Sequence, residues 1–121
     1  MITTDQDERR NFQRILFDAP VTVRLDGSLF QCKMIDISLN GALLEKPRDF
    51  NGKSGHTVFL NIRLGEEISI DMEARIAHLE GVYLGVHCIH IDMESISHLR
   101  RLVELNLGDT ALLERELSAL G

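Results

Sequence analysis

Several classes of protein are excluded by what this chain has little of. It has no tryptophan and only 5% aromatic residues, so it offers no series of stacking platforms for single-stranded nucleic acid. No stretch approaches the roughly 20 apolar residues of a membrane span. The first seven residues, Met1–Asp7, contain no hydrophobic run of the kind that a signal peptide needs. We therefore expect a cytoplasmic protein without a membrane partner.

Cysteine is also scarce. The two cysteines, Cys32 and Cys88, both fall in segments where they alternate with apolar neighbours. In a cytoplasmic protein such residues are normally reduced and buried. We expect two free thiols rather than a disulfide.

The charge balance excludes a nucleic-acid polymer as the partner. The net charge is -6, with 13 basic and 19 acidic residues, whereas polymer binding depends on many phosphate contacts made by a basic face. Apolar residues make up 44% of the 121 residues, which is enough for one folded core. The sequence predicts a single domain over residues 1–121.

Alternation of apolar and polar residues predicts six short strands. Turn-forming residues separate them, including Asp26–Gly27 and the loop Pro47–Gly55. Short antiparallel strands with short turns are typical of a closed barrel. We expect a mainly β fold, a six-stranded antiparallel β-barrel within residues 20–91. Its strands are expected over 20–25, 29–37, 41–45, 58–64, 68–76 and 82–91.

Helical spacing follows the last strand, so C-terminal α-helices are expected over residues 92–120. Asp92 is a suitable N-cap for a helix that starts at Met93, and Gly108 can end it. Asp109 can cap a last short helix. The apolar face of that helix is formed by Leu113, Leu117 and Leu120. It can cover the open end of the barrel or form a dimer seam, and we expect the former and hence a monomer.

No pattern in the sequence supports catalysis or a cofactor. His87 and His90 flank Cys88 in the tightest cluster of potential metal ligands, but side chains three apart in a regular strand point to opposite faces. Ser38 lies near Asp36 but has no histidine nearby that could act as a base. We expect neither an enzyme nor a metal site.

Three arginines lie within six residues in the segment Glu8–Arg14. The guanidinium group is a rigid fork of donors that matches a phosphate or the O6/N7 edge of guanine. Taken alone, the segment is most simply a solvated charge run near a mobile terminus. In an otherwise acidic chain it also favours a small anionic ligand.

Two spaced motifs together resemble the signature of the PilZ family, bacterial receptors for the second messenger cyclic di-GMP. The first is Arg10-x-x-x-Arg14, and the second is Asp36-x-Ser38-x-x-Gly41. The resemblance implies a Greek-key type barrel with residues 1–14 as a flexible arm that binds the ligand.

The resemblance also implies roles for these residues. Arg10 and Arg14 would contact phosphate oxygens and the guanine O6/N7 edge. Asp36 would accept hydrogen bonds from guanine N1–H and N2–H₂, and Ser38 would complete that edge. Gly41 would let the chain turn tightly and approach the ligand. Independently of the family, the second motif can be an Asx turn between two strands, and such a turn can also present a site.

The residue before the arginine motif carries a further implication. In the family, an arginine at the position of Arg9 goes with an intercalated cyclic di-GMP dimer, so the resemblance implies two ligand molecules per chain. His78 either stacks on a base or is an exposed residue near a strand end. The resulting hypothesis is a receptor and adaptor whose arm moves on binding and signals to an unidentified protein partner. The alternative is a ligand-independent β-barrel module for protein interaction.

Overall fold

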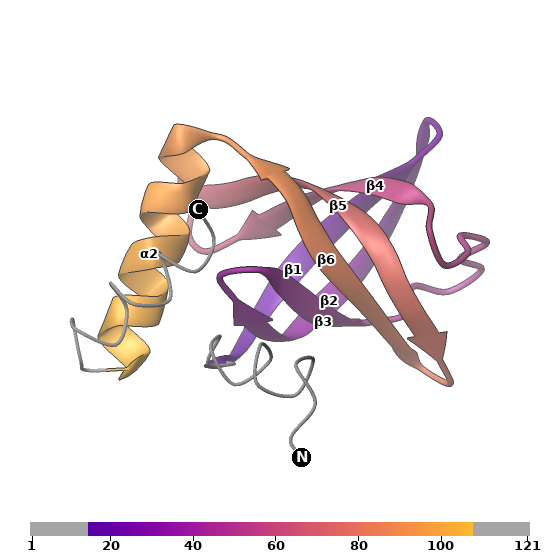
Figure 1. Ribbon diagram of the computed structural model, residues 1–121, viewed down its shortest axis with the longest axis horizontal. Coiled ribbons are helices and arrows are strands. Elements are labelled where there is room, and N and C mark those ends of the chain that lie inside the picture. The colour runs from indigo at the N-terminus through magenta and orange to yellow at the C-terminus, as the bar shows by residue number, and fades with distance from the viewer. Residues whose placement is uncertain (1–14, 108–121) are drawn as a thin grey trace, which may run out of the picture.

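The computed structural model describes residues 15–107 of the chain. In this range six antiparallel strands close into a barrel, and one helix follows them (Figure 1). The expected six-stranded barrel is therefore confirmed. Its elements are β1 (Ile15–Leu25), β2 (Ser28–Ser38), β3 (Gly41–Glu45), β4 (Thr57–Arg63), β5 (Ser69–Glu80), β6 (Tyr83–Ile91) and α2 (Met93–Leu107).

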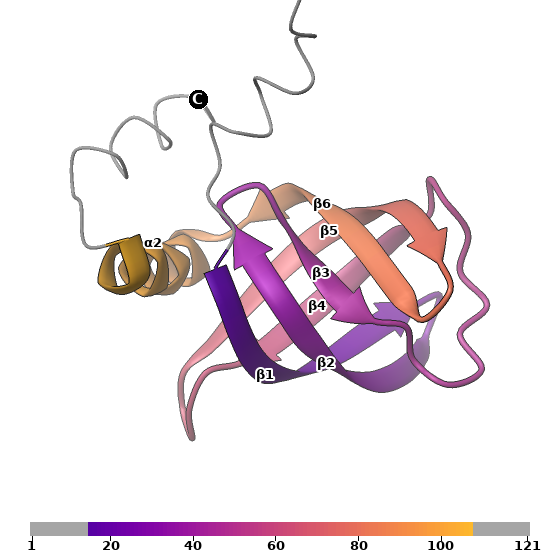
Figure 2. The same ribbon diagram turned by 90° about the horizontal axis from the view of Figure 1, so that it is seen from below.

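The strand order around the barrel is β1-β2-β3-β6-β5-β4, and pairing between β1 and β4 closes it. Strands β1, β2 and β3 follow one another as hairpins, and the longer loop after β3 leads to β4, which returns to pair with β1. Three hairpin-connected strands with a fourth beside the first form a Greek key. Figure 2 shows β1, β2 and β3 together on one side of the barrel, with α2 at one end.

The first strand begins five residues earlier than expected, at Ile15 rather than at Pro20. Its pairing with β2 shifts register between Leu16 and Ala19. An extra residue in a strand breaks the period of two that identifies strands in a sequence. The expected barrel of residues 20–91 is therefore extended to include 15–19.

The same effect shortened the prediction for β5. The expected strand ended at Ile76, whereas β5 continues to Glu80. The register with β6 shifts between Ile76 and His78, which leaves Ala77 as the extra residue. Beyond this bulge, alternation no longer identifies the strand.

The barrel interior is filled by aliphatic side chains from all six strands. The helix closes part of this core, because Leu99 and Val103 of α2 are both fully buried and the helix packs against β5. Because the inward face of each strand forms this core, only the outward face is available to contact a ligand or a partner. The largest fully buried side chains are Met34, Ile37, Leu44, Ile62, Ile70, Ile76, Leu84 and Leu99.

The start of α2 is tied to β5 through one buried serine. Ser95 is 2% exposed, donates its backbone amide to Asp92 Oδ2 at 3.2 Å, and accepts the amide of Asp71 on its Oγ at 2.8 Å. Hydrogen bonds from the Ser95 hydroxyl and amide lower the pKa of the Asp92 carboxyl. The predicted N-cap at Asp92 is thus confirmed.

The expected end of α2 at Gly108, and the last helix after Asp109, lie outside the described residues. No helix within residues 15–107 is long and apolar enough to cross a membrane.

Candidate functional site

The second half of the two-part motif forms the turn between β2 and β3. Ser38 ends β2, Gly41 begins β3, and these two residues pair across the turn. The Ser38 hydroxyl donates to Asn40 Oδ1 at 2.6 Å, and the Asn40 carbonyl accepts the backbone amide of Cys88 on β6 at 2.8 Å. The turn is therefore held by its own side chains and attached to a third strand.

A bulge in β2 decides which way Asp36 faces. Met34 pairs with Leu44, but Asp36 pairs with Leu43, so Ile35 is an extra residue in β2. Met34 and Leu44 are both buried in the core. Without the bulge, Asp36 would share the inward face of Met34. With it, the carboxylate takes the opposite face of the sheet.

Asp36 belongs to a row of residues that runs across five strands. Leu16 pairs with Asp36, Asp36 with Leu43, Leu43 with Gly85, and Gly85 with His78. Leu16 is 80% exposed and His78 is exposed, so the row lies on the outer face of the barrel, although Asp36 within it is only 8% exposed. Asp36 and His78 are three strands apart, about 14 Å along the sheet. The row thus brings two predicted site residues onto one surface without placing them in contact.

Gly85 determines how His78 lies. A Cβ at Gly85 would sit 3.5–3.7 Å from three atoms of the imidazole ring. The ring therefore lies against the β6 backbone while the residue as a whole stays exposed. An imidazole supported in this way can offer its other face to a flat ligand.

The structure gives Gly41 a packing role. A Cβ at this position would overlap the Val86 carbonyl oxygen and lie 3.3 Å from the Cα of His87. Both neighbours are backbone atoms of β6, which pairs with β3 at this point. A glycine is needed here for the close approach of two strands, whether or not it also faces a ligand.

The arginine end of the motif lies outside the described residues, but the strand that follows it does not. Arg14 is bonded to Ile15, and Ile15 pairs with Ile37, the residue between Asp36 and Ser38. The chain thus enters the barrel beside the second half of the motif, although the two halves are separated in sequence. The predicted site residues without described positions are Arg9, Arg10 and Arg14.

The histidines of β6 differ from the expectation in one respect. His87 pairs with Arg75 and His90 with Glu73, with Ile89 as an extra residue between them. This bulge places both imidazoles on the outer face, so the expectation of opposite faces was wrong. Within residues 15–107, no group of three or more histidine, cysteine or acidic side chains is arranged to hold a metal ion.

Cys32 and Cys88 are free, half-buried thiols on β2 and β6. Burial raises the pKa of Cys32 to about 11, and the nearby Glu45 carboxylate adds to the shift. Burial also raises the pKa of Cys88. Both thiols are therefore weak nucleophiles near neutral pH.

Comparison with known protein families tests the resemblance to the PilZ family that the two motifs suggested. The model of the PilZ domain matches residues 8–105, which include both halves of the motif. The chain belongs to the PilZ family. PilZ domains are non-catalytic modules of a family of cyclic di-GMP receptors, so family membership confirms the resemblance and the expectation that this domain is not an enzyme.

Solved structures agree with the barrel fold of this PilZ domain. It matches the Bacillus subtilis inhibitor of motility (MotI/DgrA) with a TM-score of 0.69 at 19% identity, over 84% of this chain and 52% of that one. It matches the PilZ domain of CeSA from a cellulose-synthesizing bacterium with a TM-score of 0.61 at 19% identity, over 79% and 96%. The Borreliella burgdorferi PlzA protein, solved in complex with c-di-GMP, matches with a TM-score of 0.51 at 24% identity, over 81% and 37%. The chain spans about half the length of MotI/DgrA.

Sequence reasoning did not find the cross-strand row or the role of Asn40. The row depends on bulges in β2 and β5 that alternation does not reveal. Asn40 did carry a signal, since Ser-x-Asn between two strands is a pattern in which side chains bond within a turn.

Proposed function

We propose that this PilZ domain binds cyclic di-GMP between the Arg10-x-x-x-Arg14 segment and the turn that runs from Asp36 to Gly41. The observation that carries the proposal is the pairing of Ile15 with Ile37. It brings the strand that follows Arg14 directly beside the second half of the motif. A receptor needs both halves at one place, and this register supplies the reason for their spacing.

The chemistry of the turn suits the edge of a guanine. A carboxylate accepts hydrogen bonds on both oxygens, so that of Asp36 would take both N1–H and N2–H₂ of guanine. The single hydroxyl proton of Ser38 already points to Asn40 Oδ1. If that bond is kept, Ser38 contributes as an acceptor through its free lone pairs. Arg10 and Arg14 would supply the bidentate donors for phosphate and for the O6/N7 edge.

Two ligand molecules per chain are proposed, on the basis of Arg9. Two stacked, intercalated nucleotides present more phosphate and more guanine edges than one, and a third guanidinium can meet them. His78, on the same outer row as Asp36, offers a flat surface toward which a base of such a stack can extend.

Binding is proposed to rearrange the arm of residues 1–14 and to signal to a protein partner in the cytoplasm. Ordering backbone costs about 1–2 kcal/mol per residue. Hydrogen bonds to charged groups contribute about 1.5–3 kcal/mol each and can offset that cost. The closed arm would present a new surface, which fits an adaptor.

Isothermal titration calorimetry with cyclic di-GMP tests the proposal. We expect binding by the wild-type chain at micromolar ligand, and loss of the heat signal in Arg10→Ala and in Arg14→Ala. Arg101→Ala is the matched control, because this arginine is exposed on α2 and should leave binding unchanged. A wild-type chain that gives no heat would leave the barrel as a ligand-independent interaction module and refute the proposal.

A further inference from the structure

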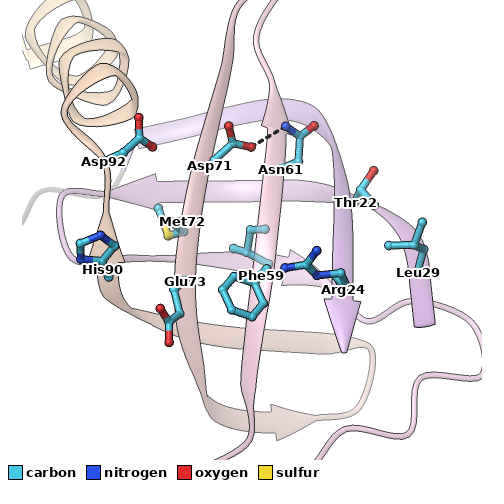
Figure 3. A pocket seen from close by; sticks show the side chains of 11 residues that line it. Thr22, Arg24, Leu29, Phe59, Asn61, Asp71, Met72, Glu73, His90 and Asp92 are labelled. Carbon is cyan, nitrogen blue, oxygen red and sulfur yellow. Dashed lines mark hydrogen bonds between the residues drawn. The ribbon is translucent and has the colours of Figure 1, made fainter. Parts of the chain in front are cut away.

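A concave surface lies on the outside of the barrel, away from the proposed nucleotide site. This outer groove has a volume of about 420 Å³ and crosses β1, β4 and β5 next to the start of α2 (Figure 3). Arg24, which lines it, is nine residues from Ile15 on β1, about 30 Å along an extended strand. The groove therefore lies at the opposite end of β1 from the Asp36 turn.

The groove is built on one row of residues across five strands. Leu29 pairs with Arg24, Arg24 with Phe59, Phe59 with Glu73, and Glu73 with His90. Leu29 is 65% exposed and Phe59 is 43% exposed. The Arg24 guanidinium lies 4.6 Å from the centre of the Phe59 ring, a cation–π contact that holds both side chains in place. The row thus presents two ordered apolar side chains, Leu29 and Phe59, to solvent.

The side of the groove nearest β5 and α2 is acidic. Asp71, Glu73 and Asp92 line it, and Arg24 is the only lysine or arginine among the described residues that do so. Asp71 accepts a hydrogen bond from Asn61 at 2.7 Å (Figure 3). Within residues 15–107, by contrast, the side chain of Glu73 makes neither a hydrogen bond nor an ion pair. Its carboxylate remains available to a cation, whereas an anionic nucleotide would be repelled.

We propose that the outer groove docks a basic segment of a partner protein that also carries an aromatic or aliphatic side chain. The apolar side chain would seat on Phe59 and Leu29, and a neighbouring lysine or arginine would pair with Glu73. The apolar ring of Phe59 and the carboxylate of Glu73 lie on neighbouring strands of one row, because the strand register pairs these two residues. The net charge of -6 would in addition attract a basic partner from solution.

The closed barrel also limits how such a segment can bind. At the groove, Arg24, Phe59 and Glu73 each pair with a residue on either side, so these three positions offer no open sheet edge for an added strand. Recognition must therefore depend on side chains, and a few central ones should dominate the binding energy. Nothing in this inference requires nucleotide binding, so it can be tested in the absence of cyclic di-GMP.

The test is a selection from a random phage-displayed library of peptides about twelve residues long, on the full chain without nucleotide. We expect enriched peptides in which lysine or arginine flanks an aromatic or large aliphatic residue. Their affinity, measured by fluorescence anisotropy on the synthesised peptides, should fall about tenfold or more in Phe59→Ala and in Glu73→Lys. Leu16→Ala and Glu45→Lys are matched controls on exposed residues away from the groove and should leave it unchanged.

Several results would overturn the inference. One is a selection that yields no enrichment, or that yields acidic peptides. Another is a set of basic peptides that bind both groove variants as well as the wild type, with circular dichroism confirming that each variant is folded. A wild-type dimer in size-exclusion chromatography that Phe59→Ala converts to a monomer would identify a second copy as the occupant instead.

Discussion

Replacing Gly41 with alanine should destabilise the whole barrel. The added Cβ would overlap the Val86 carbonyl oxygen and approach the Cα of His87 to 3.3 Å. Neither neighbour is a side chain that can rotate away, so β3 and β6 must move apart where Gly41 pairs with His87. The strand β3 has only five residues and cannot spread the displacement over a long ladder.

Overpacking of this kind costs about 1–3 kcal/mol. Each kcal/mol lowers Tm by about 4–8 °C in a domain of 60–100 residues and by about 2–4 °C in one of 150–250 residues, and this chain lies between them. We therefore expect a loss of at least about 3 °C in Tm, measured by differential scanning calorimetry without ligand. Because it is measured without cyclic di-GMP, this decrease in Tm is independent of any effect of the substitution on nucleotide binding.

Gly65→Ala is the matched control. No atom lies within 4 Å of a Cβ built on Gly65, and its φ is not positive. Its backbone amide donates to Ile68 O at 3.1 Å, a bond that alanine keeps. The control should change the free energy of unfolding by less than about 1 kcal/mol, toward either sign. Equal Tm values for the two variants would refute the role assigned to Gly41.

Three further predictions concern other residues. Arg9→Leu should change the calorimetric stoichiometry from about two cyclic di-GMP molecules per chain to about one, and a wild-type value near one would refute the role given to Arg9. The pKa of Asp92 is lowered from 3.8 by hydrogen bonds from Ser95, so the stability that its carboxylate contributes is present above pH 3.8 and is lost as the pH falls through the lower folded value. In urea unfolding between about pH 5 and pH 2, Asp92→Asn should weaken the dependence of the free energy of unfolding on pH. An unchanged pH dependence would contradict this role of Asp92. Cys32, with its pKa raised to about 11 by burial and by Glu45, should hold about 100-fold less thiolate at pH 8 than a thiol at its ordinary value. Its alkylation by iodoacetamide, followed by mass spectrometry, should be correspondingly slow until urea unfolds the chain, and rapid alkylation of the native protein would count against this burial.

Regular strands could be predicted from the sequence because their side chains keep a period of two. In β5, Ile70, Met72, Ala74 and Ile76 are all buried as that period requires. The N-cap at Asp92 was predicted because a capping residue directly precedes a segment with helical spacing. These features depend only on neighbours along the chain.

Features that depend on bulges could not be predicted in this way. Alternation places Asp36 on the inward face of Met34, and only the extra residue Ile35 reverses it. Extra residues Ala77 and Ile89 likewise change the faces of His78 and of the β6 histidines. A bulge is set by pairing with the neighbouring strand, which a single strand's sequence does not specify.

The candidate site itself was recognised through a spaced motif rather than through chemistry. Nothing in local sequence joins Ile15 to Ile37, and that pairing alone brings the strand after Arg14 beside the turn that starts near Asp36. The outer groove was missed for the same reason. Arg24, Phe59 and Glu73 lie on three different strands and meet only through register.

The proposed site is tested most directly by mapping cyclic di-GMP on the backbone amide signals of the ¹⁵N-labelled chain. Binding at the motif should shift the signals of Asp36–Gly41 and of His78 on the outer row, while those of Arg24 and Phe59 in the outer groove stay within the noise. Spectra that do not change at saturating nucleotide, or that change mainly at Arg24 and Phe59, would contradict a receptor site at the turn between β2 and β3.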